Sequence, residues 1–246
     1  LNPKNAKYVI KNLDFGIKQA AENKKIALVT GPIQKSNIVD GGFKNFQGHT
    51  EWIQKRTKSN NVVMLLASKK IKVALATTHI PLADVAINIK KARLIEIIKI
   101  LHSDLKNKLK IKYPSITVLG LNPHAGEDGD IGTEEKIIII PAIKEVLENT
   151  TYDLSGPISA DTAFSYDNRK KYDLAICMYH DQALIPIKTL DFHNGVNVTL
   201  GLDFIRTSPD HGTGFDIAGQ DKANPQSLIS AINLAYKMSI NKKNDK

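Results

Sequence analysis

Three histidines in this chain, His79, His124 and His180, each follow a short apolar run. Such runs, bounded by polar or turn residues, predict buried parallel strands. In an open α/β sheet the ligand site lies beyond the carboxyl ends of the strands, so three imidazoles far apart in sequence could meet there. Three neutral imidazoles leave one position open on a tetrahedral metal, which is typical of a catalytic site. We therefore predict that these histidines bind a metal.

A second group of candidate residues is the sequence Gly48-His49-Thr50-Glu51. It precedes a helix predicted from Glu51 to about Lys55, with Thr50 as the N-cap. A helix N-terminus presents unpaired N–H groups and a partial positive charge, which suit an anion such as phosphate. His49 and Thr50 would add side-chain donors. The alternative is an ordinary helix cap by Thr50.

A third stretch contains Lys188, Asn197 and Arg206. Lys188 follows an apolar run, so its ammonium group is expected to be partly buried, where it could transfer a proton or hold a carboxylate. Asn197 lies in a predicted strand, where asparagine is rare, and is either paired structurally or directed at a ligand. Arg206 could bind carboxylate or phosphate with both arms of its guanidinium. A salt bridge to Asp203 or Asp210 is the alternative for Arg206.

Two further residues have more than one interpretation. Asp161 follows the Gly156-Pro157 turn and is either a helix cap or a catalytic carboxylate. His211 lies in Asp-His-Gly-Thr-Gly and either lines a site or hydrogen-bonds its own turn.

The elements that must position these side chains alternate between strands and helices, which predicts an α/β sheet that is at least partly parallel. Pro141 could split one helix. The C-terminal helix is expected to pack through Leu228, Ile229, Ile232, Ala235 and Tyr236. The predicted strands are 26–30, 62–67, 72–76, a strand ending near 124, 172–179 and 196–200, and the helices are 8–23, one opening at 81, 92–105, 134–148 and one after 225.

Composition narrows the function classes. The chain has 246 residues and a net charge of +9, but the charge comes mainly from dispersed lysines and only four arginines. No basic cluster with interleaved aromatics is present, so we expect no nucleic-acid partner, whereas a small phosphorylated substrate fits the charge. No apolar run is long enough to span a membrane. The single cysteine, Cys177, lies in an apolar run and fits a reducing cytoplasm.

Read together, these segments resemble one family, the 4-hydroxythreonine-4-phosphate dehydrogenases of vitamin B6 biosynthesis. The matching segments recur in the family's order over nearly the whole chain, which is far more specific than any single motif. They are Leu28–Lys35, Gly48–Glu51, Ala76–Leu82, Leu119–Glu127, Gly132–Glu135, Gly156–Pro157 with Ala160–Thr162, Met178–Gln182, Gly195–Leu202, Ile205–Ser208 and Asp210–Thr213.

The resemblance implies roles for the candidate residues. His79, His124 and His180 would bind one divalent metal, Zn, Mg or Co. Asp161 and Lys188 would be catalytic. Substrate contacts would come from His49, Thr50, Lys188, Asn197 and Arg206.

The resemblance also implies a fold and a quaternary structure. Residues 1–246 would form a single catalytic chain of two interleaved α/β subdomains with a mostly parallel sheet, related to isocitrate and isopropylmalate dehydrogenases. The enzyme would be a homodimer with its active site at the interface. Family members usually begin with a Gly-Asp-Pro-rich strand and further elements upstream, so we expect several dozen residues to be absent and a sheet edge to be exposed.

The implied reaction is the oxidation of 4-phosphohydroxy-L-threonine by NAD or NADP. The β-keto acid product decarboxylates to 3-amino-2-oxopropyl phosphate, for pyridoxine 5'-phosphate biosynthesis. A dehydrogenase of threonate or erythronate 4-phosphate is the nearest alternative. A zinc hydrolase with three histidines and a phospholigand-binding module without activity are more distant ones.

Overall fold

A computed structural model describes residues 1–241 of the chain. These residues fall into two compact units. The first unit comprises Leu1–Val62 together with the chain from Val196 onward, and the second comprises Val63–Gly195. Each unit has its own hydrophobic core.

The second unit is built on five strands in the order β2-β3-β6-β4-β5. β2 and β3 form an antiparallel hairpin, whereas β3, β6, β4 and β5 are parallel to their neighbours. The carboxyl ends of β3, β6 and β4 therefore lie at one edge of the sheet, as the pattern of histidines predicts. The strand bounds are β2 Val63–Ala67, β3 Lys72–Leu75, β4 Ser115–Leu119, β5 Asp153–Ile158 and β6 Leu174–Cys177.

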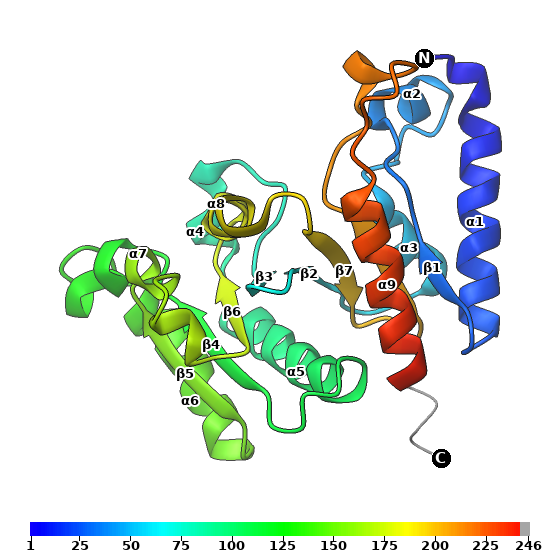
Figure 1. The fold of residues 1–246 in the computed structure, drawn as a ribbon. Helices are drawn as coiled ribbons and strands as arrows, with labels where there is room; N and C mark the ends of the chain where they lie inside the picture. The colour runs from blue at the N-terminus through cyan, green and yellow to red at the C-terminus, as the bar shows by residue number, and fades with distance from the viewer. Residues whose placement is uncertain (242–246) are drawn as a thin grey trace. The chain divides into compact units, whose positions relative to one another are not determined.

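Helices connect these strands (Figure 1). Helix α5 buries an apolar stripe at helical spacing, with Leu94, Ile97, Ile98, Leu101 and Leu105 all nearly inaccessible. The helical segments are η2 Leu82–Asp84, α4 Val85–Asn88, α5 Lys91–Asn107, η3 Pro123–Gly129, η4 Glu135–Ile139, α6 Ile140–Asn149, α7 Ala160–Ala163, η5 Asn168–Lys170 and α8 His180–Asp191.

The first unit contains three strands in the order β1-β8-β7, with β1 parallel and β7 antiparallel to β8. Helix α9 packs against all three strands, and α1 packs against β1, α2 and α3. The bounds are η1 Pro3–Asn5, α1 Ala6–Glu22, β1 Ala27–Val29, α2 Lys35–Asp40, α3 His49–Thr57, β7 Val196–Leu200, β8 Ile205–Pro209, η6 Phe215–Ile217 and α9 Gln226–Asn241.

The α/β class and its mostly parallel pairing are confirmed, and so are most of the expected elements. Two strands do not follow from apolar periodicity. β5 contains Gly156-Pro157, which predicts a turn, but β5 is the last strand of its sheet and an edge tolerates proline. β8 contains Arg206, Thr207 and Ser208, which are polar yet buried.

Pro141 does not break a helix in the middle. It lies at the start of α6, directly after the π-helical turn η4. Ile139 and Ile140 both have α-helical backbone, so the helix continues through this point, and the π-turn lies where Pro141 has no N–H to donate.

The prediction of which α9 residues pack against the sheet is wrong for four of its five residues. Leu228, Ile229, Ile232 and Tyr236 are exposed, and Ala235 is buried together with Ala231 and Met238. The helix approaches the sheet through its small residues, and the Thr207 hydroxyl donates to the carbonyl of Ala231 at 2.9 Å. Helical periodicity gives two candidate apolar faces here, and only the contact with the sheet selects one.

No helix in residues 1–241 combines the length and the apolar character needed to cross a membrane.

Candidate functional site

His79 and His180 lie side by side beyond the carboxyl ends of β3 and β6. Their ring centroids are 5.6 Å apart. Both strands end earlier than expected, at Leu75 and Cys177, because the chain bends there, and His180 is the first residue of α8. The two rings line a pocket of about 320 Å³ whose walls include Leu82.

His124 lies on a separate segment with an unusual backbone. β4 ends at Leu119, so His124 is not at the strand end as predicted but in η3, five residues further along. Residues 124–128 all have positive φ angles, between 43° and 84°, and only Gly126 among them is a glycine. Left-handed backbone is rare for other residues and tends to occur at functional sites.

Two of the three imidazoles are oriented by carboxylates. His124 Nδ1 is 2.5 Å from Glu127 Oε1, and His180 Nδ1 is 2.8 Å from Asp181 Oδ1. A carboxylate at Nδ1 favours the tautomer that carries its proton there, which leaves the Nε2 lone pair for a metal ion. The donor chemistry of these two side chains therefore fits a metal site.

The described chain brings two imidazoles together, not three. Among residues 1–241 no group of three or more His, Cys, Asp or Glu side chains is arranged to hold a metal ion. A metal with His79 and His180 as ligands needs a further ligand that this arrangement does not provide. The three-histidine metal site stays a prediction.

In the first unit, Arg206 is the centre of a buried polar cluster. Its side chain comes from β8 and is 3% exposed, and its guanidinium donates to Thr199 Oγ1 at 3.0 Å and Thr30 Oγ1 at 2.8 Å. Burial lowers the pKa of Arg206 to about 10, and the opposing Glu51 charge raises it, so the guanidinium is charged at neutral pH. Within residues 1–241 both of these hydrogen bonds from the buried cation go to neutral hydroxyls, which suits it to an anionic ligand.

Unpaired polar atoms gather around this guanidinium. Four buried side-chain atoms in the described residues have no hydrogen-bond partner, and three of them are His49 Nε2, Asn197 Oδ1 and Arg206 Nε. Asn197 and Thr199 lie on one face of β7, and Thr199 is directly opposite Arg206 in the register. Unpaired buried groups cost free energy unless a ligand satisfies them. We call His49, Asn197 and Arg206 the Arg206 cluster.

His49 occupies the first position of α3, which corrects the predicted helix start. The helix runs from His49 to Thr57, and Gly48 rather than Thr50 is its N-cap. Gly48 has a φ of 158°, which residues with a side chain rarely adopt, so this position favours glycine. Thr50 lies in the first turn, next to the unpaired N–H groups at which it was predicted to act.

The burial of His49 makes a testable contribution to acid sensitivity. Burial, with a smaller contribution from the Arg206 charge, lowers the pKa of His49 to about 4. As the pH falls below about 6.5, protons bind this histidine in the unfolded protein but not in the folded one. The free energy of unfolding therefore decreases between about pH 6.5 and pH 4. We expect a loss of ~3 kcal/mol from this group between pH 7.5 and pH 4.

Urea unfolding of the wild type and His49→Gln at both pH values measures this loss. His211→Gln is the control, since His211 is exposed. Equal pH sensitivity in the wild type and His49→Gln would contradict the assignment.

The model of one protein family matches nearly the whole described chain. The family is described as "Pyridoxal phosphate biosynthetic protein PdxA", and the match covers residues 1–235. This chain belongs to the PdxA family. The resemblance noted in the sequence is thereby confirmed.

Relatives of this PdxA-family chain carry one consistent description. A 4-hydroxythreonine-4-phosphate dehydrogenase from Ruegeria sp. (strain TM1040) is 48% identical over 238 residues, which cover 97% of this chain and 73% of that protein. One from Sulfurihydrogenibium sp. (strain YO3AOP1) is 47% identical, over 91% of this chain and 68% of that protein. These relatives are oxidoreductases by name.

Solved structures agree with the fold. A 4-hydroxythreonine-4-phosphate dehydrogenase from Klebsiella pneumoniae matches with a TM-score of 0.86 at 34% identity, over 97% of this chain and 72% of that one. A terephthalate 1,2-cis-dihydrodiol dehydrogenase from Burkholderia xenovorans LB400 matches with a TM-score of 0.72 at 24% identity, which speaks for the fold alone.

Asp161 is an exposed carboxylate in the second unit of this PdxA-family chain. It lies in the first turn of α7, whose N-cap is Ser159, so Asp161 itself is not the cap. The Ser159 hydroxyl donates to it, and this bond is the main reason why the pKa of Asp161 lies below its usual range, with a smaller contribution from the His124 charge. Asp161 and His124 are thus close enough to interact.

Lys188 and His211 have clear local surroundings. Lys188 is half-buried on α8, and its Nζ lies 5.3 Å from the ring centroid of Phe192. His211 Nδ1 lies 2.9 Å from the carbonyl oxygen of Gly212, so His211 bonds its own turn, the second of its two predicted roles.

Two residues that contact Arg206 were not given a role by the sequence analysis. Thr30 and Thr199 are the acceptors of the guanidinium. Thr199 interrupts an apolar strand, which is a signal that sequence reasoning can use. Thr30 ends a predicted strand and carries no comparable signal.

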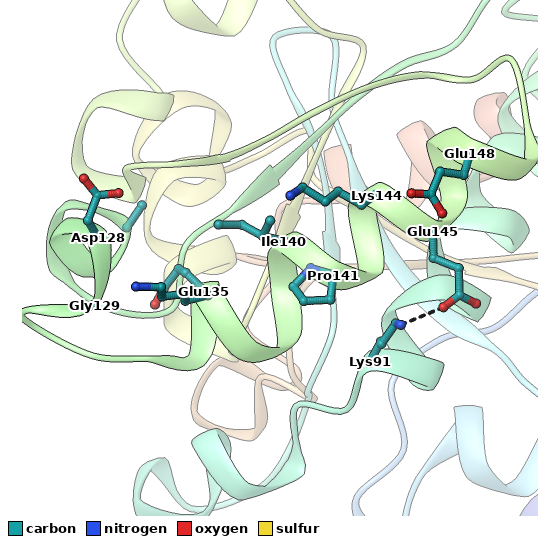
Figure 2. A pocket seen from close by; sticks show the side chains of 11 residues that line it. Lys91, Asp128, Gly129, Glu135, Ile140, Pro141, Lys144, Glu145 and Glu148 are labelled. Carbon is teal, nitrogen blue, oxygen red and sulfur yellow. Dashed lines mark ion pairs between the residues drawn. The ribbon is translucent and has the colours of Figure 1, made fainter.

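A larger pocket, of about 520 Å³, lies in the second unit away from His79 and His180. Figure 2 shows its charged lining, in which Lys91 on α5 points toward Glu145 on α6, with an ion pair of 2.7 Å. Its lysines and glutamates offset one another, and we assign no ligand to it.

Proposed function

We propose that this PdxA-family chain is a metal-dependent, NAD(P)-linked dehydrogenase acting on 4-phosphohydroxy-L-threonine. The product, a β-keto acid, would decarboxylate to 3-amino-2-oxopropyl phosphate in pyridoxine 5'-phosphate biosynthesis. The observation that supports an anionic substrate is the Arg206 cluster, with its buried cation and three unpaired polar atoms. The names of the relatives suggest which substrate it is.

The Arg206 cluster and Thr50 would hold the charged ends of the substrate. The Arg206 guanidinium supplies a fixed positive charge. His49 Nε2, which is unpaired, can form a hydrogen bond with a ligand atom, and Asn197 Oδ1 can accept a hydrogen bond from a hydroxyl or amino group. Binding through these groups places the reacting carbon without contributing to the chemistry itself.

His79 and His180 would bind the divalent metal, with His124 of the partner subunit as the third ligand. The proposal of a homodimer rests on the pairing of only two imidazoles within one chain. The identity of the metal, Zn, Mg or Co, is left open. When bound, the metal would supply Lewis-acid polarisation of the substrate and NAD or NADP would accept the hydride.

Asp161 and Lys188 are the proposed catalytic residues. Asp161 is an exposed carboxylate that is ionised at neutral pH, as an aspartate ordinarily is, so it can accept a proton, and the bond from Ser159 orients it. Lys188 would hold the substrate carboxylate or stabilise negative charge that develops during decarboxylation. The single cysteine is buried, which fits the proposed cytoplasmic location.

Asp161→Asn is expected to lower kcat by at least about 100-fold with KM within about threefold, because the amide cannot accept the proton. Initial rates with a nicotinamide readout measure both constants. Asp167→Asn, another exposed carboxylate of the second unit, is the matched control. An unchanged kcat in Asp161→Asn would remove this residue from the chemistry.

Side-by-side turnover assays test the proposed function. The purified protein is given NAD or NADP with 4-phosphohydroxy-L-threonine, threonate 4-phosphate or erythronate 4-phosphate, and reduced cofactor is followed by absorbance. We expect reduction with the first substrate. Reduction only with the other two would favour the sister dehydrogenase, and ester hydrolysis without nicotinamide would favour a zinc hydrolase. Ligand binding that survives chelation, without turnover, would indicate an inactive binding module.

A further inference from the structure

The segment that carries His124 is held in place by a buried carboxylate. Glu135 is 3% exposed, and its Oε1 accepts from the backbone N–H groups of Leu121 and Asn122 at 2.7 and 2.8 Å. Its Oε2 accepts from the Asn122 side-chain amide at 2.9 Å. A Cβ at Gly126 would lie 2.7 Å from the same Oε2, so the segment wraps closely around this carboxylate.

These contacts matter because of the backbone that they support. Residues 124–128 are left-handed throughout, a conformation that persists only where the surroundings determine it. His124 is itself exposed, so contacts of its own ring with a protein core do not hold the segment. The segment is therefore held by contacts of the residues before and after His124.

Gln182 connects this segment to the one that carries His180. Its Nε2 donates to the Gly120 carbonyl oxygen at 2.9 Å, and its Oε1 accepts from the Met178 N–H at 2.7 Å. Gly120 lies directly before the residues that Glu135 holds, and Met178 is two residues before His180. One side chain therefore spans the segments that follow β4 and β6.

Thr77 makes the corresponding link to the His79 segment. Its hydroxyl donates to the Met178 carbonyl oxygen at 2.6 Å, and it is 8% exposed. The backbone N–H of Thr77 donates to the same oxygen at 3.2 Å. Met178 is thus bonded by Thr77 on its C=O and by Gln182 on its N–H.

We propose that Gln182 and Thr77 are positioning residues for the metal site. Thr77 bonds the His79 segment to Met178, two residues before His180, and Gln182 bonds the same Met178 and, through Gly120, holds the segment that would present His124 to the partner's site. They would act through the backbone of Met178 and Gly120 and not as ligands of the metal. This inference rests on the proposed function, since it assumes that the histidines bind a metal. Both residues lie in segments that match the family, but neither of them has a role assigned from the sequence.

The test measures Co²⁺ binding to the purified protein by its visible absorption. Gln182→Met removes both bonds of this side chain at similar length. We expect Co²⁺ affinity to fall at least tenfold, with shifted absorption bands, because the segments that carry His180 and His124 are no longer fixed. Thr77→Val keeps the shape of the side chain, and we expect a loss of at least threefold. Its backbone bond to Met178 remains, so this variant should fold even where Gln182→Met does not.

Two matched controls make the same chemical changes elsewhere. Gln54→Met removes a bond from a side-chain amide to the Asn60 carbonyl, and Thr150→Val removes a hydroxyl bond to the Val146 carbonyl. Both should bind Co²⁺ as the wild type does. Thermal midpoints of all variants without metal show whether an effect on binding exceeds an effect on stability.

His124→Asn separates failure of the inference from failure of the proposed function, since asparagine tolerates left-handed backbone but has no imidazole. If His124→Asn loses Co²⁺ while Gln182→Met and Thr77→Val keep the wild-type affinity and spectrum, the inference is overturned and the metal site stands. If His124→Asn binds Co²⁺ as the wild type does, the proposed metal site fails and the inference fails with it. Reduced thermal midpoints with an unchanged spectrum would assign Gln182 and Thr77 a purely structural role.

Discussion

His124→Ala is expected to abolish metal binding while the protein stays folded. The side chain is exposed and its ring bonds only its neighbour Glu127 in the described chain, so its removal leaves no cavity and no buried group unpaired. The metal would lose one of three protein ligands, and affinity would fall by orders of magnitude. Elemental analysis after gel filtration measures the metal content, and circular dichroism checks the fold.

Two comparisons make this result decisive. His124→Asn separates loss of the imidazole from any change in backbone preference, since asparagine adopts left-handed backbone more readily than alanine. His102→Ala is the control outside the proposed site, because His102 stacks on Tyr152 instead, with ring centroids 3.5 Å apart. Metal retained at the wild-type ratio in His124→Ala would exclude His124 as a ligand.

Arg206→Lys is expected to weaken binding of the phosphorylated substrate at least tenfold, or about 1.4 kcal/mol. Lysine keeps the positive charge but has one nitrogen in place of the planar fork, whose two terminal nitrogens bond Thr199 and Thr30 separately, so the geometry offered to a ligand is lost. The expected change lies in KM more than in kcat, because the cluster binds the substrate and takes no part in the chemistry. Steady-state kinetics over a range of substrate concentrations provides both constants.

The matched control is Arg169→Lys, since the Arg169 guanidinium lies over the Tyr166 ring, 5.4 Å from its centroid, in the second unit. It should leave both constants unchanged. A thermal melt of Arg206→Lys shows whether the altered cluster still folds. A folded Arg206→Lys protein with the wild-type Michaelis constant would limit Arg206 to a structural role.

The sequence alone was sufficient for the fold class and for the placement of two of the three metal-binding candidates, His79 and His180. Apolar runs alternating with amphipathic helices predict an α/β sheet, because each period follows from local backbone geometry. The positions of His79 and His180 beyond neighbouring parallel strands also follow, because such strands share one carboxyl edge. The order of short motifs along the chain identified the family.

Other features depend on contacts that no local pattern contains. The exposed face of α9 was misassigned because two apolar faces alternate on one helix, and the small residues Ala231 and Ala235 face the sheet. β8 was not predicted because its residues Arg206, Thr207 and Ser208 are polar. They are buried by the neighbouring strands and by α9, which no local pattern reveals. Burial of polar groups is a property of the whole unit.

The sequence by itself determined the candidates for the chemistry: three histidines after apolar runs, and an arginine, an asparagine and a histidine in motifs of one family. Only the tertiary structure decided how they are arranged. It pairs two imidazoles instead of three, bends the His124 segment into left-handed backbone around Glu135, and leaves three atoms near Arg206 without partners. The physical reason is that hydrogen-bond satisfaction and strain are set by residues far apart in the chain, such as Gln182 and Gly120, which are 62 positions apart.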